Sequence, residues 1–527
     1  MNADLSKIID LINKKEFLKA ILQIGPLISK QPRNYELNKI IGVAYLGNKN
    51  FISAIAHLTK CFEYNKKDFQ VIINLSYSHL QIQEYNRSMA YSKNAMMLDN
   101  QNPSSYQNLA NAYYHISDFD QALNYSKKTI EIYGGNFSEQ LIKYSNVIIL
   151  QANILLALKK FEEFEKFCLS YLNKNIILTD LAKLLIRHNR ELISETHLEM
   201  INAHIKLEFK NNTSRVEYVS HKAACHFALA EYFDGYKKNE SEKNYHIAND
   251  LIKSIQRKSS YDRQKLYKNI KFFFEKNFHN YLPNTNVSSK NNIFILGMPR
   301  SGTTLVESIL STAENVLIGG ERVFFLMMLE KFFSDFNNEL IFEKSFFDEL
   351  AKGYFRNIEL SENKNCIYVD KMPANFLYFG FIKMALPHAK FIHVKRNSWD
   401  NAISLYKSNY RDNIPYASSF FDIASEYANY EMIINFWKNI FGQNCFIEVK
   451  YEDIVNHTDD FVKKIWRDCD LSGHYSSERR KEHYSSTASK QQVNKEIFQH
   501  SLKKRDFEDQ KDIFFETLDL QKNYWSI

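Results

Sequence analysis

The chain of 527 residues contains no run of eighteen apolar residues, and its six cysteines include no CxxC pair. A membrane-spanning helix needs about 20 mostly apolar residues, so we expect no membrane span. The cysteine spacing predicts neither a zinc site nor a disulfide framework, and it indicates buried thiols in a reducing compartment. Residues 1–17 also lack the apolar core of a signal peptide. We therefore expect a cytoplasmic protein.

A strong excess of one charge is missing as well. The chain has 68 basic and 61 acidic residues, a formal net charge of +7. This mild excess suits a pocket for an anionic ligand and does not by itself indicate a nucleic-acid partner. The hydrophobic fraction of 45% and the charged fraction of 24% are ordinary for a globular protein. The length predicts two or three structural units.

The first 136 residues repeat with a period of 34. Two sets of positions show the period: the aromatic set Phe17, Phe51, Tyr85 and Phe119, and the small set Ala20, Ala54, Ser88 and Ala122. Small residues are needed where two helices cross closely, and aromatic rings fill the gaps between repeats. This pattern is typical of tetratricopeptide (TPR) repeats. It predicts helical hairpins near 1–34, 35–68, 69–102 and 103–136.

The register then slips, because an insertion near 134–136 displaces Phe161 and Phe164. Divergent helical hairpins continue to about residue 280, so we predict a TPR-type domain at 1–280. The segment 281–292 is polar and non-periodic, and it is predicted to be a linker. The concave face of this solenoid would be either a groove for a peptide or partner, or a scaffold that only packs against the second domain.

From residue 293 short apolar runs alternate with helical stretches, as in a parallel α/β sheet. Four runs are predicted strands: 293–296, 366–369, 391–394 and 445–449. Polar residues follow each run at once, including Lys371, Arg396 and Tyr451. Because ligands bind at the carboxyl ends of strands in open α/β sheets, we expect one site at this edge.

The first predicted strand leads into the loop 297–304, GMPRSGTT. Gly297 and Gly302 are five residues apart, as in the P-loop pattern GxxxxGK[ST], but Thr303 stands where the lysine should be. The loop amides and the following helix would still bind an anion. Without the lysine of nucleotide hydrolases, and with Arg300 as a different cation, the loop predicts a phosphate-bearing nucleotide that is handled differently. A variant NTPase loop or a chance glycine loop are the alternatives.

The segment 297–305, GMPRSGTTL, resembles the 5′-phosphosulfate-binding motif of sulfotransferases, whose donor is 3′-phosphoadenosine 5′-phosphosulfate (PAPS). It is most similar to the branch that contains tyrosylprotein sulfotransferases and bacterial TPR-containing sulfotransferases. The resemblance implies a three-layer α/β sulfotransferase domain at 293–527, adenosine 3′,5′-bisphosphate as product, and no metal. It implies donor binding by the loop residues Pro299, Arg300, Ser301, Gly302, Thr303 and Thr304.

Further donor contacts are implied downstream. Arg396 and Ser404 have the spacing of the sulfotransferase 3′-phosphate motif, in which arginine gives two parallel N–H bonds to the phosphate. Taken alone, Arg396 could be a solvated surface charge. Tyr451 resembles a donor-contacting tyrosine and could equally be a core aromatic residue.

The resemblance implies that three residues upstream of position 489 are catalytic. Glu321 occupies the position of the catalytic glutamate of the tyrosylprotein enzymes and would be the general base. His393 is the alternative base, although its strand position favours a core histidine. Lys371 and Arg300 would stabilise the leaving group. The alternative for Lys371 is a structural ion pair with Asp370.

The segment 489–493 matches the S-x-x-Q-V pattern that closes over the donor in the tyrosylprotein family. It implies that Ser489 is also catalytic and contacts the bridging or phosphosulfate oxygen of the leaving group, with Gln492 and Val493 also at the donor. Lys504 falls where that family has a phosphate-binding lysine, although Arg505 replaces the neighbouring tryptophan.

The sequence therefore predicts a PAPS-dependent sulfotransferase acting on a hydroxyl of a protein tyrosine, a carbohydrate or a small molecule. The TPR face could bind a peptide or protein acceptor. Ser408 stands where tyrosylprotein enzymes carry a second arginine, which weakens the match to peptide tyrosine. The alternative is a TPR adaptor with an inactive nucleotide-binding domain. The joint presence of Glu321, Lys371 and Ser489 favours the enzyme.

Overall fold

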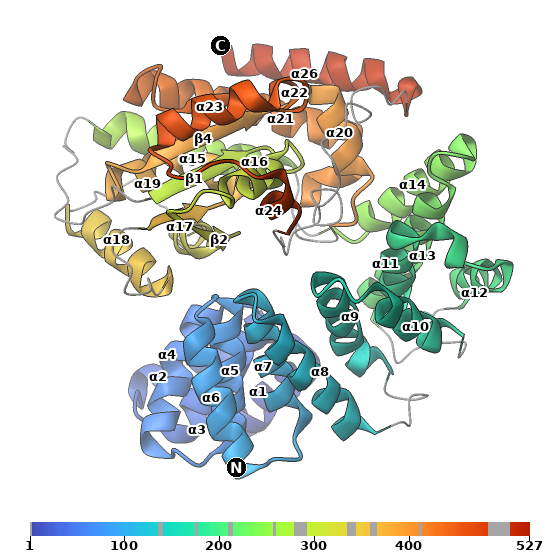
Figure 1. Ribbon diagram of the computed structural model, residues 1–527. Coiled ribbons are helices and arrows are strands. Elements are labelled where there is room, and N and C mark those ends of the chain that lie inside the picture. Colours follow the sequence, from blue (N-terminus) through green and yellow to red (C-terminus); the bar gives the residue numbers. More distant parts are fainter. Residues whose placement is uncertain are drawn as a thin grey trace. The chain divides into compact units, whose positions relative to one another are not determined.

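Two compact units make up the chain, Met1–Phe167 and Cys168–Ile527, and each has a hydrophobic core of its own (Figure 1). The computed structural model describes residues 3–134, 141–173, 178–208, 214–256, 260–278, 292–334, 344–358, 366–410, 414–482 and 506–526. No helix in these ranges combines the length and the apolar character that a membrane crossing requires.

The first unit is a run of helical hairpins, coloured blue to teal in Figure 1. Its helices are α1 (Ala3–Asn13), α2 (Phe17–Lys30), α3 (Tyr35–Gly47), α4 (Phe51–Tyr64), α5 (Phe69–Gln81), α6 (Tyr85–Leu98), α7 (Pro103–His115), α8 (Phe119–Tyr133) and α9 (Leu141–Ala157), with α10 (Phe161–Leu172) reaching into the second unit. Successive helices from α1 to α9 pack on one another. The predicted N-terminal run of TPR-like hairpins is confirmed.

The period of 34 also appears in the backbone of the turns. A residue with positive φ precedes the second helix of each hairpin: Lys15 (59°), Lys49 (59°), Gln83 (64°) and Ser117 (65°). The next such residue, Lys159, follows 42 residues after Ser117, eight more than the period. Left-handed φ is uncommon outside glycine, so its recurrence marks one turn geometry used repeatedly. The eight extra residues account for the slip in register.

Stacked rings repeat with the same period and join the two helices of three hairpins. The pairs are Tyr45–His57, His79–Tyr91 and Tyr113–Tyr125, with centroids 5.6, 5.4 and 5.4 Å apart. A small residue also allows α3 and α4 to pack closely, because a Cβ on Gly42 would lie 2.8 Å from the side chain of Leu58. Such packing between neighbours is the main source of stability in a repeat array.

The second unit contains a five-stranded parallel sheet in the order β2-β3-β1-β4-β5. The strands are β1 (Asn292–Gly297), β2 (Val316–Gly320), β3 (Ile367–Asp370), β4 (Lys390–Lys395) and β5 (Ile447–Lys450). Every residue of the central strand β1 is buried, as expected for a strand covered on both faces. The predicted parallel sheet is confirmed.

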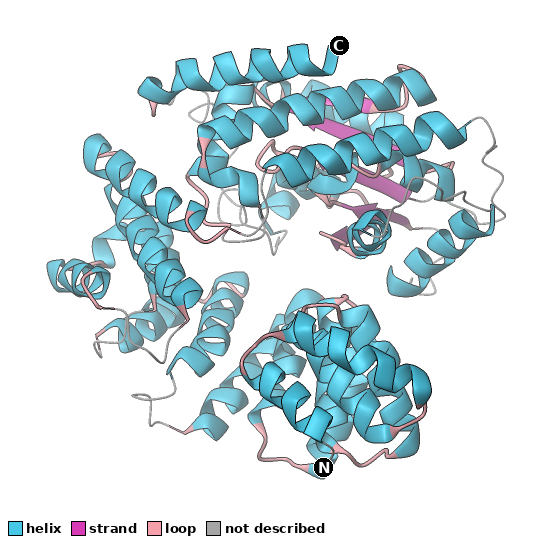
Figure 2. Cartoon of the chain, turned by 180° about the vertical axis from the view of Figure 1, so that it is seen from behind, coloured by secondary structure: helices cyan, strands magenta, loops and turns pink. Residues whose placement is uncertain are grey.

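Helices cover both faces of this sheet, as Figure 2 shows. Ile295 packs in a cluster with α16 (Thr303–Leu310) and α23 (Thr458–Cys469), whereas Phe294 packs with α17 (Phe324–Ser334), α19 (Phe379–Ala385) and α21 (Phe420–Phe441). Adjacent residues of one strand therefore serve opposite cores. The remaining helices are α11 (Thr179–His188), α12 (Glu195–Ile205), α13 (Arg215–Phe233), α14 (Lys238–Lys253), α15 (Ser260–Asn277), α18 (Lys344–Ile358), α20 (Ser398–Tyr406), α22 (Tyr451–Asn456), α24 (Ser477–Glu482) and α26 (Lys511–Ser526). The predicted three-layer arrangement is confirmed.

Helices α13 to α15 share the larger of these two cores. Phe274 of α15 packs edge-on against Trp437 of α21, with centroids 4.8 Å apart. Arg263 of α15 forms a two-point ion pair with buried Glu426, in which Nε lies 2.8 Å from Oε2. The predicted linker at 281–292 stays a prediction, because residues 279–291 lie outside the described part of the chain.

This packing predicts which fragment folds. A fragment of residues 178–527 keeps α13 to α15 and should unfold cooperatively in urea. A fragment of residues 284–527 would remove Phe274 from Trp437 and leave Glu426 without Arg263, a loss of roughly 3–5 kcal/mol for the broken ion pair alone. We expect the shorter fragment to be insoluble or to lack a cooperative transition. A cooperative transition of equal midpoint in both fragments would contradict this.

Candidate active site

The loop after β1 is held against its neighbours by two glycines. A Cβ on Gly297 (φ +151°) would lie 2.4 Å from the carbonyl oxygen of Val394, and a Cβ on Gly302 (φ +106°) would lie 2.4 Å from the ring of Tyr451. Only glycine permits both the close approach and the backbone angle. The loop therefore lies directly beside the carboxyl end of β4 and the start of α22.

Groups suited to an anion gather at this loop. Gly302 is the N-cap of α16 and supplies no capping side chain. Backbone N–H groups at the amino end of a helix bind phosphate readily. Ser301 is buried, and its Oγ has no hydrogen-bond partner among the described residues. A buried hydroxyl in this position fits a phosphate or sulfate oxygen of a donor.

The residues of the two predicted donor motifs meet here. Arg300 Nε donates to Ser404 Oγ at 3.0 Å, and Arg396 Nη1 donates to the carbonyl oxygen of Arg300 at 3.1 Å. The Arg396 guanidinium lies over the ring of Tyr451, 4.6 Å from its centroid. Asn401 of α20 donates to the carbonyl oxygen of Pro299 at 3.0 Å. Helix α20 and the loop thus form one hydrogen-bonded cluster.

The electrostatics of this cluster favour a negative ligand. Burial lowers the pKa of the Arg300 guanidinium, and the nearby positive charges of Arg187 and Arg396 lower it further. Positive side chains that lie close together and are partly shielded from water repel one another. An anion bound among them relieves that repulsion.

A second cluster joins the ends of β2 and β3. Lys371 is fully buried, and its Nζ lies 2.6 Å from Glu321 Oε1 and 3.9 Å from Glu307 Oε2. The backbone N–H of Lys371 donates to the carbonyl oxygen of Gly320 at 2.9 Å. The Glu321 side chain is 41% exposed, whereas Glu307 is buried. The structure therefore presents one carboxylate to solvent beside a buried ammonium.

The neighbouring Asp370 does not pair with Lys371. The hydroxyl of Tyr354 donates to Asp370 Oδ2 at 3.0 Å. Complete burial raises the pKa of Asp370 to about 7, against the lowering effects of Tyr354 and nearby Arg322. The alternative of an Asp370–Lys371 ion pair is thus replaced by the Glu321–Lys371 contact.

His393 lies in the core beneath this edge. Its ring is 1% exposed and its Nε2 hydrogen-bonds the hydroxyl of Tyr430. Burial lowers the pKa of His393. The remaining candidates, Ser489, Gln492, Val493 and Lys504, lie outside the described residues and stay predictions.

Residues 292–475 match a family model described as "Sulfotransferase family". The similarity to the sulfotransferase family covers this segment, which is less than half of the chain. The match begins at β1 and includes the loop, both clusters and Tyr451. The predicted resemblance to sulfotransferases is confirmed for this segment.

One relative at the sequence level is a protein of Aquifex aeolicus (strain VF5) described as "Uncharacterized protein". It is 27% identical over 312 residues, which are 54% of this chain and 39% of that protein. The chain therefore spans well under two thirds of that relative's length.

Two solved structures are similar to parts of the chain. Sulfotransferase STF1 from Mycobacterium tuberculosis H37Rv is 14% identical, with 59% of this chain and 100% of that chain covered and a TM-score of 0.25. A tetratricopeptide repeat protein from Parabacteroides merdae ATCC 43184 is 12% identical, with 47% and 91% covered and a TM-score of 0.35. Because both TM-scores are low, the fold assignment depends on the helices and strands described above.

Three residues of the family-matched segment take part in this site without having been predicted from the sequence. Glu307 is a buried acid on α16 and the one charged residue of that helix. Asn401 precedes Ser404 by three residues and so shares its helix face. Tyr410 lies where the charges of Arg300 and Glu321 both act on its hydroxyl, and burial is the main cause of its raised pKa.

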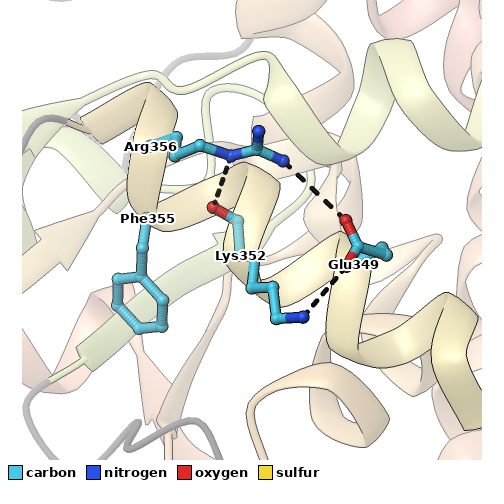
Figure 3. A pocket seen from close by; sticks show the side chains of 4 residues that line it. All are labelled: Glu349, Lys352, Phe355 and Arg356. Atoms are coloured by element: carbon cyan, nitrogen blue, oxygen red, sulfur yellow. Dashed lines mark hydrogen bonds and ion pairs between the residues drawn. The ribbon is translucent and has the colours of Figure 1, made fainter.

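A hollow elsewhere in the domain has a different character. Its volume is about 520 Å³, and it is lined by Glu349, Lys352, Phe355 and Arg356 of α18. Figure 3 shows Glu349 between the other two charges, 3.0 Å from Lys352 and 3.9 Å from Arg356. These exposed pairs along one helix are typical of a solvated face. Within the described ranges, no group of His, Cys, Asp and Glu side chains suits a metal ion.

The raised pKa of Asp370 predicts a specific dependence of stability on pH. The pKa of this carboxyl is about 7 in the folded state and about 3.8 in the unfolded chain, so the folded state holds the extra proton between these values. Its contribution to stability is therefore lost as pH rises from about 4 to 7. In Asp370→Asn, which can still accept from Tyr354, urea unfolding at pH 5 and pH 8 should differ less than in the wild type. An identical pH dependence would contradict the assignment.

Proposed function

We propose that this chain transfers a sulfuryl group from PAPS to an acceptor hydroxyl. One observation carries the proposal: Arg300 of the phosphate loop donates to Ser404, and Arg396 donates to Arg300. Two motifs about a hundred residues apart thus converge, in a loop that lacks the lysine of nucleotide hydrolases. The sulfotransferase-family match supports the same reaction class.

The donor would be bound at both of its charged ends. The amides of 299–304, with Arg300 and the buried Ser301, would hold the 5′-phosphosulfate. Arg396 and Ser404 would hold the 3′-phosphate, with Tyr451 packing beneath Arg396. Ser489, Gln492, Val493 and Lys504 are proposed as further donor contacts on their sequence match alone.

Glu321 would act as general base. The acceptor oxygen attacks sulfur, its proton passes to the Glu321 carboxylate, and the bond between sulfur and the bridging phosphate oxygen breaks. Lys371 and Arg300 would stabilise the negative charge that develops on that oxygen. Partial exposure lets Glu321 meet an acceptor, while its contact with Lys371 fixes its position.

The acceptor is proposed only as a class, namely a hydroxyl of a protein tyrosine, a carbohydrate or a small molecule. We propose that the hairpins of the first unit bind a peptide or protein, either as acceptor or as partner. All six cysteines are free thiols, which supports a cytoplasmic location. A TPR adaptor with an inactive nucleotide-binding domain is the second candidate, and the repeat array favours it as much as it favours the enzyme.

Donor recognition should depend on the 3′-phosphate. Calorimetry should show that adenosine 3′,5′-bisphosphate binds far more tightly than AMP. Arg396→Ala should remove most of the difference, roughly 10–100-fold, which is the usual value of hydrogen bonds to a charged group. Arg356→Ala on α18 is the control and should change neither affinity. Equal binding of the two nucleotides by the wild type would overturn the donor assignment.

Turnover should depend on the Glu321 carboxylate. Glu321→Gln cannot accept a proton, so we expect turnover to fall by about 10²-fold or more while donor affinity survives. The measurement is formation of adenosine 3′,5′-bisphosphate from PAPS in the presence of a lysate of source cells, with mass spectrometry of SO₃-bearing products. Glu349→Gln, an exposed carboxylate on α18, is the matched control. Full activity of Glu321→Gln would assign the base elsewhere, and a wild type without donor turnover would favour the adaptor.

A further inference from the structure

Helix α20 is held by contacts at its middle and at its carboxyl end. Its middle carries Asn401 and Ser404, which contact the phosphate loop. Its carboxyl end is held by α13 and α14, which the sequence places in the divergent repeats and which lie outside the family-matched segment 292–475.

The first anchor is a pair of contacts to Tyr406. Asn249 of α14 donates to the carbonyl oxygen of Tyr406 at 2.9 Å, and both groups are buried. His246 hydrogen-bonds the hydroxyl of Tyr406 through Nδ1 at 2.8 Å. The last carbonyls of a helix lack partners within the helix, so Asn249 satisfies one that α20 cannot satisfy itself.

The second anchor is Lys407, the C-cap of α20. Its Nζ lies 3.0 Å from Asp234 Oδ1 at the end of α13 and 2.7 Å from Asp506 Oδ2. The side chain of Lys407 is only 12% exposed. Positive charge at the carboxyl end of a helix is favourable, and this one is fixed from two sides.

We propose that the α13–α14 hairpin positions the donor site by holding α20. The proposal rests on the proposed function, because it assigns the 3′-phosphate contact to Ser404. Ser404 precedes Tyr406 by two residues, less than one helical turn, so a shift of that end moves the hydroxyl with it. Asn249 and Lys407 are positioning residues, since they act through α20. Loosening them weakens the 3′-phosphate contact more than it disturbs the loop around the 5′ group, because Gly297 also holds that loop against β4.

The test compares two nucleotides in the full chain by calorimetry. Asn249→Ala should weaken binding of adenosine 3′,5′-bisphosphate roughly tenfold, the size of one lost hydrogen bond to a charged group, and change AMP binding little. The matched control is Asn244→Ala, because Asn244 is a buried amide of the same hairpin that bonds His226 and the carbonyl oxygen of Glu240. It should leave the ratio of the two affinities unchanged.

A second pair of variants keeps the test decisive if Asn249→Ala fails to fold. Lys407→Met should lower the same ratio, and Lys407→Arg, which keeps the charge, should restore part of it. An unchanged ratio in a folded variant, or equal loss for both nucleotides, would overturn the positioning role. A wild type that does not discriminate between the nucleotides would instead overturn the proposed function.

Discussion

The close contact between Gly297 and β4 is the constraint on which the candidate site depends. A Cβ at this position would collide with the carbonyl oxygen of Val394. Glycine therefore lets the chain leave β1 at this short distance from β4. Because it does, the loop runs beside the end of β4, and Arg396 reaches the carbonyl oxygen of Arg300. The same proximity lets α20, which follows β4 directly, place Ser404 against Arg300. The glycine at position 297 thus allows two segments that are distant in the sequence to come into hydrogen-bonding contact.

The buried Lys371 imposes a second constraint, on the position of the Glu321 carboxylate. An unpaired ammonium in the protein interior costs several kcal/mol, so this lysine needs carboxylate partners. Glu307 is one partner, at 3.9 Å, and Glu321 is the other, at 2.6 Å. Since β2 is an edge strand paired only with β3, its end could otherwise move. The ion pair fixes Glu321 where its exposed face can meet a hydroxyl.

Local patterns predicted much of this architecture. The period of 34 and the glycine spacing of the loop are short-range signals, and the structure contains the hairpins and the parallel sheet that they indicate. The ion-pair partner of Lys371, in contrast, could not be predicted from a local pattern. Adjacent Asp370 was the obvious candidate, yet successive strand residues point to opposite faces, and Asp370 turns to Tyr354. The correct partner, Glu321, depends on strand order, which no local pattern encodes.

The helices before residue 279 show what else could not be predicted from the sequence pattern, namely the packing partner of a buried helix face. An amphipathic helix reveals that one face is buried, but it does not reveal what covers that face. Helices α13 to α15 read as repeats, and yet Tyr245 and Phe274 lie in the same core as Trp437 of the sheet domain. Repeats that pack only on their neighbours can diverge without disturbing a distant site. Helices that share a core with the sheet cannot diverge in this way. A loss of packing in that core would also weaken the contacts that hold α20. The hydrophobic core that supports the sheet therefore includes helices well upstream of the segment that the family match defines.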